Sequence, residues 1–214
     1  MKVIAINGSA RKNWNTHTLL NKALEGAESA GAQTELINLY DLDYKGCTGC
    51  LACKIKGGKS LGHCAVNDDL KPVLDRIDKS DGLLLGSPIY LSDITAMMRA
   101  FYERLIFQYL NYDNYSKPFY SGHLKTAFIY TGNVSEAYLN RVGYNELFKK
   151  YETTLGSYFN YTGTLLSTET LQVADYSKYH LACFNEAERK ERREKVFPDD
   201  CQKAYVLGKA MANG

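Results

Sequence analysis

Residues 2–18, KVIAINGSARKNWNTHT, decide how this chain folds. After its first lysine, the run KVIAI at 2–6 is continuously apolar, which is typical of a strand covered on both faces of a sheet. The residues at 7–15 are mostly polar, and an apolar stripe then predicts a helix from about 16 to 31. A buried strand, a short polar loop and an amphipathic helix indicate the start of an α/β sheet protein.

Strand and helix patterns continue to alternate along the chain. Further strands are predicted at 34–38, at 82–86, at 125–130 and within 162–173, and further helices from an N-cap at Asn67, at 93–110 and at 199–212. The charged run at 186–195 predicts a solvated helix face. This order predicts a doubly wound α/β fold with five strands, in which ligands bind at the carboxyl ends of the strands.

The composition excludes several classes of protein. Of the 214 residues, 45% are apolar and 23% are charged, as in soluble globular proteins. Lys and Arg (26) nearly balance Asp and Glu (24), a net charge of +2 that is too small for nucleic-acid or membrane-surface binding. No apolar run approaches the roughly 18 residues of a membrane span, and no signal peptide precedes the first strand. We therefore expect a cytoplasmic protein that binds neither nucleic acid nor membranes.

The loop after the first strand gathers hydrogen-bond donors. Its donor side chains are Ser9, Arg11, Asn15, Thr16 and Thr18. Together with amides at a helix N-terminus, they suit a terminal phosphomonoester, which accepts many hydrogen bonds. The loop has neither the G-x-G-x-x-G pattern nor Walker A spacing, which disfavours a dinucleotide or P-loop site. The alternative is a Ser/Thr-rich helix cap beside a surface arginine, although capping requires fewer donors.

With these residues the sequence resembles the flavodoxin-like NAD(P)H-dependent FMN reductase family. The phosphate loop of that family has the form G-S-x-R-x-x-x-N-T, which Gly8, Ser9, Arg11, Asn15 and Thr16 match. The resemblance implies that the last four of these residues hold the phosphate of FMN. It also implies a flavodoxin-like domain over residues 1–214, with five parallel strands in the order 2-1-3-4-5.

The loops after the third and fourth strands extend the resemblance. Residues 87–91, SPIYL, resemble the family's isoalloxazine loop, which implies that Pro88, Ile89, Tyr90 and Leu91 contact the flavin ring. We expect the amides of residues 89–92 to lie near a helix N-terminus, whose dipole would favour the negative charge of a reduced flavin. After the fourth strand, Thr131 and Gly132 are predicted to approach the ring. The alternative is an ordinary strand–turn–helix.

Four of the six cysteines lie close together in sequence. They are Cys47, Cys50, Cys53 and Cys64. A C-x2-C-x2-C triplet with a fourth cysteine resembles ferredoxin-type ligation of a [4Fe–4S] cluster, and it is also found in the iron–sulfur flavoprotein branch of the family. The ten residues before Cys64 are a longer gap than is usual in that branch. Reduced thiols without a cluster remain an alternative, as do zinc and a disulfide switch.

The resemblance implies an FMN-dependent oxidoreductase. It would transfer hydride from NAD(P)H, through bound FMN, to a second acceptor such as a quinone, a flavin or a protein. Because the flavin carries the chemistry, no catalytic side chain is predicted. One alternative is an iron–sulfur flavoprotein that exchanges electrons with a ferredoxin-like partner, and another is a redox-sensing module with a structural flavin. The family habit implies a homodimer or homotetramer.

Overall fold

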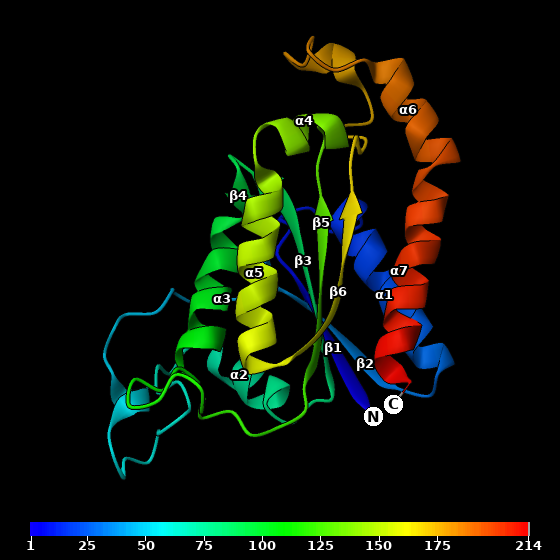
Figure 1. Ribbon diagram of the computed structural model, residues 1–214. Helices are drawn as coiled ribbons and strands as arrows, with labels where there is room; N and C mark the ends of the chain where they lie inside the picture. Colours follow the sequence, from blue (N-terminus) through cyan, green and yellow to red (C-terminus); the bar gives the residue numbers. More distant parts are fainter. Residues whose placement is uncertain (214) are drawn as a thin grey trace.

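The computed structural model describes residues 1–213, which form one sheet between two layers of helices (Figure 1). The predicted domain boundary at residue 214 lies outside the described part. The strands are β1 (Lys2–Asn7), β2 (Gln33–Asn38), β3 (Gly82–Tyr90), β4 (Asp93–Ile94), β5 (Lys125–Thr131) and β6 (Asn160–Ser167). The α-helices are α1 (Asn15–Ser29), α2 (Lys71–Ile77), α3 (Ala96–Phe107), α4 (Glu136–Arg141), α5 (Tyr144–Tyr158), α6 (Glu186–Lys195) and α7 (Phe197–Ala212).

The sheet has the predicted topology. Five of its strands run parallel in the order β2-β1-β3-β5-β6, which confirms the flavodoxin-like order. Within residues 1–213, the two-residue β4 makes a sixth strand and pairs antiparallel with the end of β3. The chain leaves β1 outward to β2 and then returns to β3 on the other side. The strand order therefore reverses between β1 and β3, and a ligand crevice is expected where these two strands end.

Both faces of the central strands are covered. Residues 3–6 of β1 and residues 83–85 of β3 have no exposed surface. Ile4 and Ile6 belong to the hydrophobic cluster that includes side chains of α2, α3 and α5. Val3 and Ala5 belong to the cluster that includes α1 and α7. Alternate side chains of each strand therefore pack into the hydrophobic clusters on opposite faces of the sheet, which explains why these strands are continuously apolar.

Helices α1 and α7 pack closely on one face of the sheet (Figure 1). A Cβ atom on Gly208 would lie 1.7 Å from the carbonyl oxygen of Ala23, and one on Gly26 would lie 1.9 Å from that of Tyr205. Real Cβ atoms never approach backbone so closely, and neither carbonyl moves without its helix. Both contacts therefore require glycine.

Three of the predicted helices differ from the structure. The helix expected at 93–110 begins only at Ala96, because β3 continues to Tyr90 and turns back as β4. Asn67 is not an N-cap, since α2 begins at Lys71 after Leu70. The run at 186–195 is helical, but Arg189 within it is buried.

Helix α5 was not predicted from the sequence at all. Its buried residues Phe148, Tyr151 and Leu155 follow a helical period, but polar residues, threonines and a glycine surround them. Within residues 1–213, none of the helices combines the length and the apolar character that crossing a bilayer requires.

We predict that Gly208→Ala destabilises the protein by about 3 kcal/mol, the upper part of the range for overpacking, because the added methyl meets backbone. For a chain of this length the melting temperature should fall by roughly 6–12 °C, measured by thermal denaturation. Gly156→Ala in the exposed part of α5 is the matched control, because its Cβ would meet only Tyr161 at 3.8 Å. That variant should gain about 0.5–1 kcal/mol, and equal losses in both variants would contradict the close packing of α1 and α7.

Candidate functional site

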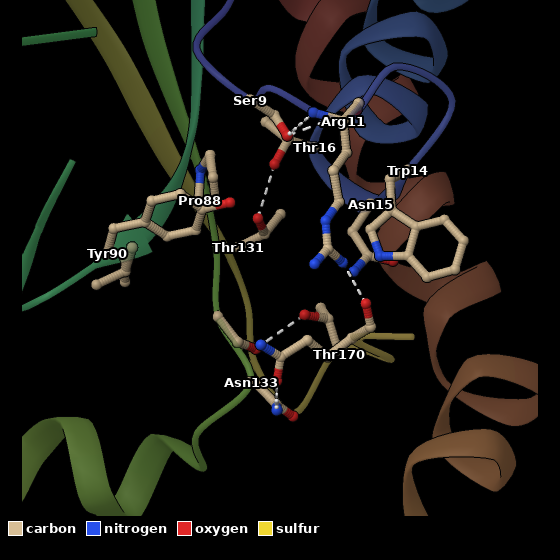
Figure 2. A pocket seen from close by; sticks show the side chains of 13 residues that line it. Ser9, Arg11, Trp14, Asn15, Thr16, Pro88, Tyr90, Thr131, Asn133 and Thr170 are labelled. Carbon is tan, nitrogen blue, oxygen red and sulfur yellow. Dashed lines mark hydrogen bonds between the residues drawn. The ribbon is translucent and has the colours of Figure 1, made fainter. Parts of the chain in front are cut away.

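A cavity of about 140 Å³ opens at the carboxyl edge of the sheet (Figure 2). It is formed by the loop after β1 with the first turn of α1, by the ends of β3 and β5, and by the loops that follow β5 and β6. Its lining residues are Ser9, Arg11, Trp14, Asn15, Thr16, Pro88, Ile89, Tyr90, Thr131, Gly132, Asn133, Thr170 and Gln172. The cavity lies where the strand order reverses, as expected for a doubly wound sheet.

The structure brings together nine of the eleven predicted flavin-site residues. They are Ser9, Arg11, Asn15, Thr16, Pro88, Ile89, Tyr90, Thr131 and Gly132. The other two lie elsewhere. Thr18 is two residues beyond Thr16 on α1, which turns it to another side of the helix, where it lines a different cavity with Lys22 and Arg193. Leu91 is fully exposed at the tip of a turn.

The loop after β1 is fixed to the end of β3. Its Gly8 amide donates to the carbonyl of Gly86 at 2.8 Å. The hydroxyl of Thr95 donates to the carbonyl of Gly8 at 2.7 Å, and the Thr95 amide donates to Oγ of Ser87 at 3.0 Å. Thr95 is only 1% exposed. The first and second loops are therefore held in one arrangement.

Helix α1 presents an uncapped N-terminus to the cavity. Trp14 occupies its N-cap position, and no side chain among residues 1–213 caps the helix there. The first turn contains no acidic residue. Asn15 and Thr16, the first two residues of the helix, are buried against the cavity. The free amides and the positive end of the helix dipole therefore favour an anion at this point.

The loop after β6 forms the far wall of the cavity. Its Leu171 carbonyl accepts hydrogen bonds from Nε1 of Trp14 at 3.1 Å and from Nδ2 of Asn15 at 2.8 Å. The guanidinium of Arg11 donates to the carbonyl of Gln172. The donors of residues 11–15 thus converge on residues 171–172.

The sequence analysis missed the wall residues Asn133, Thr170 and Gln172. Thr170 is 5% exposed, and its hydroxyl donates to the carbonyl of Gly132 at 3.0 Å. The last strand was placed only within 162–173, so the start of its following loop was not defined. The rule that ligands bind at carboxyl ends of strands would have pointed to these residues once β6 was known to end at Ser167.

The segment at 90–93 is a hairpin turn. Leu91 and Ser92 have φ values of +48° and +68°, and Tyr90 pairs with Asp93. Two consecutive positive φ angles are typical of a type I′ turn, which usually contains Asn or Gly. The amides of residues 89–92 therefore belong to a hairpin. The expectation that they lie at a helix N-terminus was wrong, since α3 begins at Ala96.

The four clustered cysteines line a second, smaller cavity. Cys47, Cys50, Cys53 and Cys64 surround a space of about 20 Å³ beside the C-terminal end of α3. All six cysteines are free thiols. Among residues 1–213, no group of three or more His, Cys, Asp or Glu side chains stands ready to hold a metal ion. The cysteines thus share one cavity without forming a closed metal site.

Arg104 of α3 holds both ends of the cysteine loop. It is 1% exposed and donates to the carbonyls of Lys45 and Val66, each at 3.3 Å, and to the carboxylate of Asp68. Burial acts to lower the pKa of Arg104, but Asp68 and Cys64 outweigh it and the net shift is upward. A permanent positive charge therefore lines the cysteine cavity.

Lys54 brings a second cation to the same loop. Its Nζ donates to the Gln108 carbonyl at 3.0 Å and lies 4.8 Å from the centre of the Phe107 ring. Burial raises the pKa of the Cys53 thiol, and the neighbouring Lys54 opposes that shift. This cavity adjoins the C-terminal end of α3, and the carboxyl-edge cavity adjoins its start. The length of that helix, 12 residues or about 18 Å, therefore separates them.

A parallel sheet of order 2-1-3-4-5 with a cavity where the strand order reverses defines a protein of the flavodoxin-like fold class. The family described as NADPH-dependent FMN reductase matches residues 1–132. The chain belongs to this family.

Curated relatives match only part of the chain. An iron-sulfur flavoprotein of Methanocaldococcus jannaschii is 36% identical over 104 residues, which are 49% of this chain and 51% of that protein. One from Archaeoglobus fulgidus is 33% identical over 106 residues, 50% of this chain and 46% of that protein. The chain therefore spans about half the length of the curated relatives it matches.

Solved structures share the fold over the whole chain. An NAD(P)H:quinone oxidoreductase from Methanothermobacter marburgensis matches with a TM-score of 0.66 at 15% identity, covering 100% of this chain and 96% of that one. An azoreductase from Bacillus anthracis matches with a TM-score of 0.66 at 13% identity, covering 98% and 99%. At these identities the likeness establishes the fold alone.

We predict that Arg104→Ala lowers the free energy of unfolding by roughly 3 kcal/mol, because it leaves the Asp68 carboxylate and two loop carbonyls without their partner. Labelling of Cys53 by a thiol reagent should also become faster, measured by mass spectrometry. The control is Arg99→Ala on the same helix, whose ion pair with Glu103 is about 40% exposed and should matter by less than about 1 kcal/mol. Equal effects of the two variants would contradict the role given to Arg104.

Proposed function

We propose that this chain binds FMN in the carboxyl-edge cavity and acts as an NAD(P)H-dependent oxidoreductase. The observation that carries the proposal is the uncapped N-terminus of α1, which faces the cavity beside Ser9 and Arg11. A phosphate with nearly two negative charges fits a site made of helix amides, hydroxyls, an amide side chain and one guanidinium. Membership of the FMN reductase family supports the same cofactor.

In this proposal the lining residues divide into two groups. Ser9, Arg11, Asn15 and Thr16 would hold the phosphate. The residues proposed to contact the ring are Pro88, Ile89, Tyr90, Thr131 and Gly132. FMN held there would supply the chemistry of hydride transfer between NAD(P)H and a second acceptor. The residues of the chain would bind FMN and orient its ring.

The second acceptor is proposed to be a planar compound such as a quinone or a flavin. Tyr90 lines the cavity while 46% of its surface is exposed, so an aromatic face is available at the rim. A planar ring would stack on such a face. The turn that carries Tyr90 is held by Tyr144 of α5, whose hydroxyl donates to Oγ of Ser92 at 3.0 Å.

We predict that the wild-type chain is yellow or takes up added FMN, and that NADH or NADPH bleaches this flavin without oxygen. Arg11→Ala should bind FMN about 10- to 150-fold more weakly, because a charge-assisted contact to the phosphate is lost. The affinity is measured by titrating apoprotein and following flavin fluorescence.

Lys12→Ala is the matched control, because Lys12 pairs with Asp41 at 2.6 Å and its side chain is half exposed. It should bind FMN like the wild type. An Arg11→Ala variant that keeps its affinity would contradict the phosphate site, and a bound flavin that neither nucleotide reduces would contradict the reductase activity.

The cysteine cavity supports a second candidate function, an iron–sulfur flavoprotein that passes electrons to a ferredoxin-like partner. Four thiols around one cavity match the number and type of ligands of a [4Fe–4S] cluster. Arg104 and Lys54 would offset the negative charge of the thiolates. The names of the relatives point the same way. In this proposal Cys47, Cys50, Cys53 and Cys64 are the ligands.

We predict that protein purified without oxygen is brown and contains about four iron atoms per chain. Replacing Cys50 or Cys53 by Ser should remove most of this iron, measured by elemental analysis and the visible spectrum. Cys201→Ser is the control, because Cys201 lines a cavity on the opposite face of the sheet, among residues of α1 and α7. Wild-type protein without iron would contradict the cluster and leave the FMN reductase proposal intact.

A further inference from the structure

The arginines of helix α6 bond to other parts of the molecule, whereas two of its lysines pair within the helix. Lys190 and Lys195 pair with acidic residues of their own helix, Glu186 and Glu191. The three arginines at positions 189, 192 and 193 share one face, since they are three and four residues apart. Each of them bonds outside the helix.

Arg189 binds the loop after β5. It is 8% exposed, and its Nε donates to Oδ1 of Asn133 at 2.9 Å while Nη2 donates to the Asn133 carbonyl at 3.2 Å. Its remaining nitrogen pairs with Glu169 at 3.2 Å. This buried guanidinium therefore fixes both the backbone and the side chain of one cavity residue.

Arg193 binds the first turn of α1. Its Nη1 donates to Oδ1 of Asn15 at 2.8 Å, across 178 positions of sequence. The guanidinium lies over the Phe197 ring, 4.0 Å from its centre. Arg192, between the two, donates to Asp200 at 2.7 Å, and the Ser167 hydroxyl donates to the same carboxylate. The helix is thus anchored to α7 and to the end of β6.

The two asparagines are oriented by the same chemistry. A guanidinium has only donors, so each asparagine must turn its Oδ1 toward the arginine and its Nδ2 away from it. Nδ2 of Asn15 then donates to the Leu171 carbonyl at 2.8 Å. Nδ2 of Asn133 donates to Oε1 of Gln172 at 2.6 Å. Both amide groups therefore reach residues 171–172 of the loop after β6, of which Gln172 lines the cavity.

We propose that Arg189 and Arg193 form a two-arginine clamp that orients Asn15 and Asn133 and so prepares the cavity for the phosphate end of FMN. The inference rests on the proposed FMN site and adds positioning residues to it. Both arginines follow residue 132, the last residue that the family model matches. Preorganisation raises affinity because the ligand does not have to order its own site.

The competing explanation is that the positive charges of Arg189 and Arg193 attract the phosphate of FMN directly, through their electrostatic field. Glu169 pairs with Arg189, so the charge of that arginine is largely offset. Arg193 contacts the neutral amide of Asn15, and its charge is not offset there. A clamp would change the FMN affinity through the asparagine that each arginine holds, whereas an electrostatic field would change it without that asparagine. A double-mutant cycle separates these two explanations.

The experiment titrates the full-length apoprotein with FMN and with riboflavin. Arg193→Ala and Arg189→Ala should each weaken FMN binding roughly 10-fold, the size expected when one charged hydrogen bond is lost. In an Asn15→Ala background, Arg193→Ala should change the affinity less than about twofold, and Arg189→Ala should do the same in an Asn133→Ala background. Riboflavin binding should change little, because it lacks the phosphate. Lys190→Ala and Lys195→Ala are matched controls and should bind FMN like the wild type.

Each possible outcome either supports or contradicts the two-arginine clamp. Wild-type affinity in both arginine variants, or full additivity in both cycles, overturns the clamp while Arg11→Ala still tests the site itself. Equal losses for FMN and riboflavin also overturn it. If the wild type binds no FMN, the proposed function fails and the clamp fails with it. Circular dichroism verifies folding, and should Arg189→Ala not fold, the cycle of Arg193 with Asn15 decides alone.

Discussion

One buried hydroxyl joins the parts of this molecule on which its candidate site depends. The side chain of Thr95 donates to the Gly8 carbonyl at 2.7 Å and accepts from the Met98 amide at 3.2 Å. It therefore caps α3 and at the same time holds the loop after β1. The same side chain therefore fixes both the start of α3 and the position of the loop after β1. Because the first loop leads into α1, this constraint also places the N-terminus of α1 beside the carboxyl-edge cavity. Because α3 carries Arg104, the same constraint places the cysteine loop.

The sequence predicted the parts of the fold that follow from local pattern. Continuous apolar runs at 2–6 and 82–86 identified central strands, because burial on both faces leaves no room for polar residues. The motif at 8–16 was found because it directly follows such a strand. Prediction failed where distant contacts decide. Asn67 was predicted to begin a helix, but its neighbour Asp68 binds Arg104, 36 positions away. The hairpin at 90–93 was missed because Leu91 and Ser92 adopt positive φ without Gly or Asn.

The candidate site divides in the same way. Nine of the predicted residues lie on the loop after β1 and the first turn of α1, at the end of β3, and at the end of β5 with the residue that follows it, where sequence motifs mark them. Its far wall comes from the loop after β6, whose residues 171–172 bond to residues 11–15 across more than 150 positions of sequence. No periodicity indicates such a contact. The run at 186–195 shows the same limit, since its composition gives no sign that Arg189 is buried while Lys190 is exposed.

The charges at two helix ends explain why the two cavities suit different chemistry. The N-terminal turn of α1 carries partial positive charge, contains no acid and lies beside Arg11, so it favours a bound anion. The C-terminal end of α3 carries partial negative charge, which by itself disfavours the thiolate forms of nearby cysteines. Lys54 binds the last carbonyls of that helix, and Arg104 lines the same cavity. These two cations offset the helix end, and thiolates become compatible with this position whether they bind a cluster or remain free.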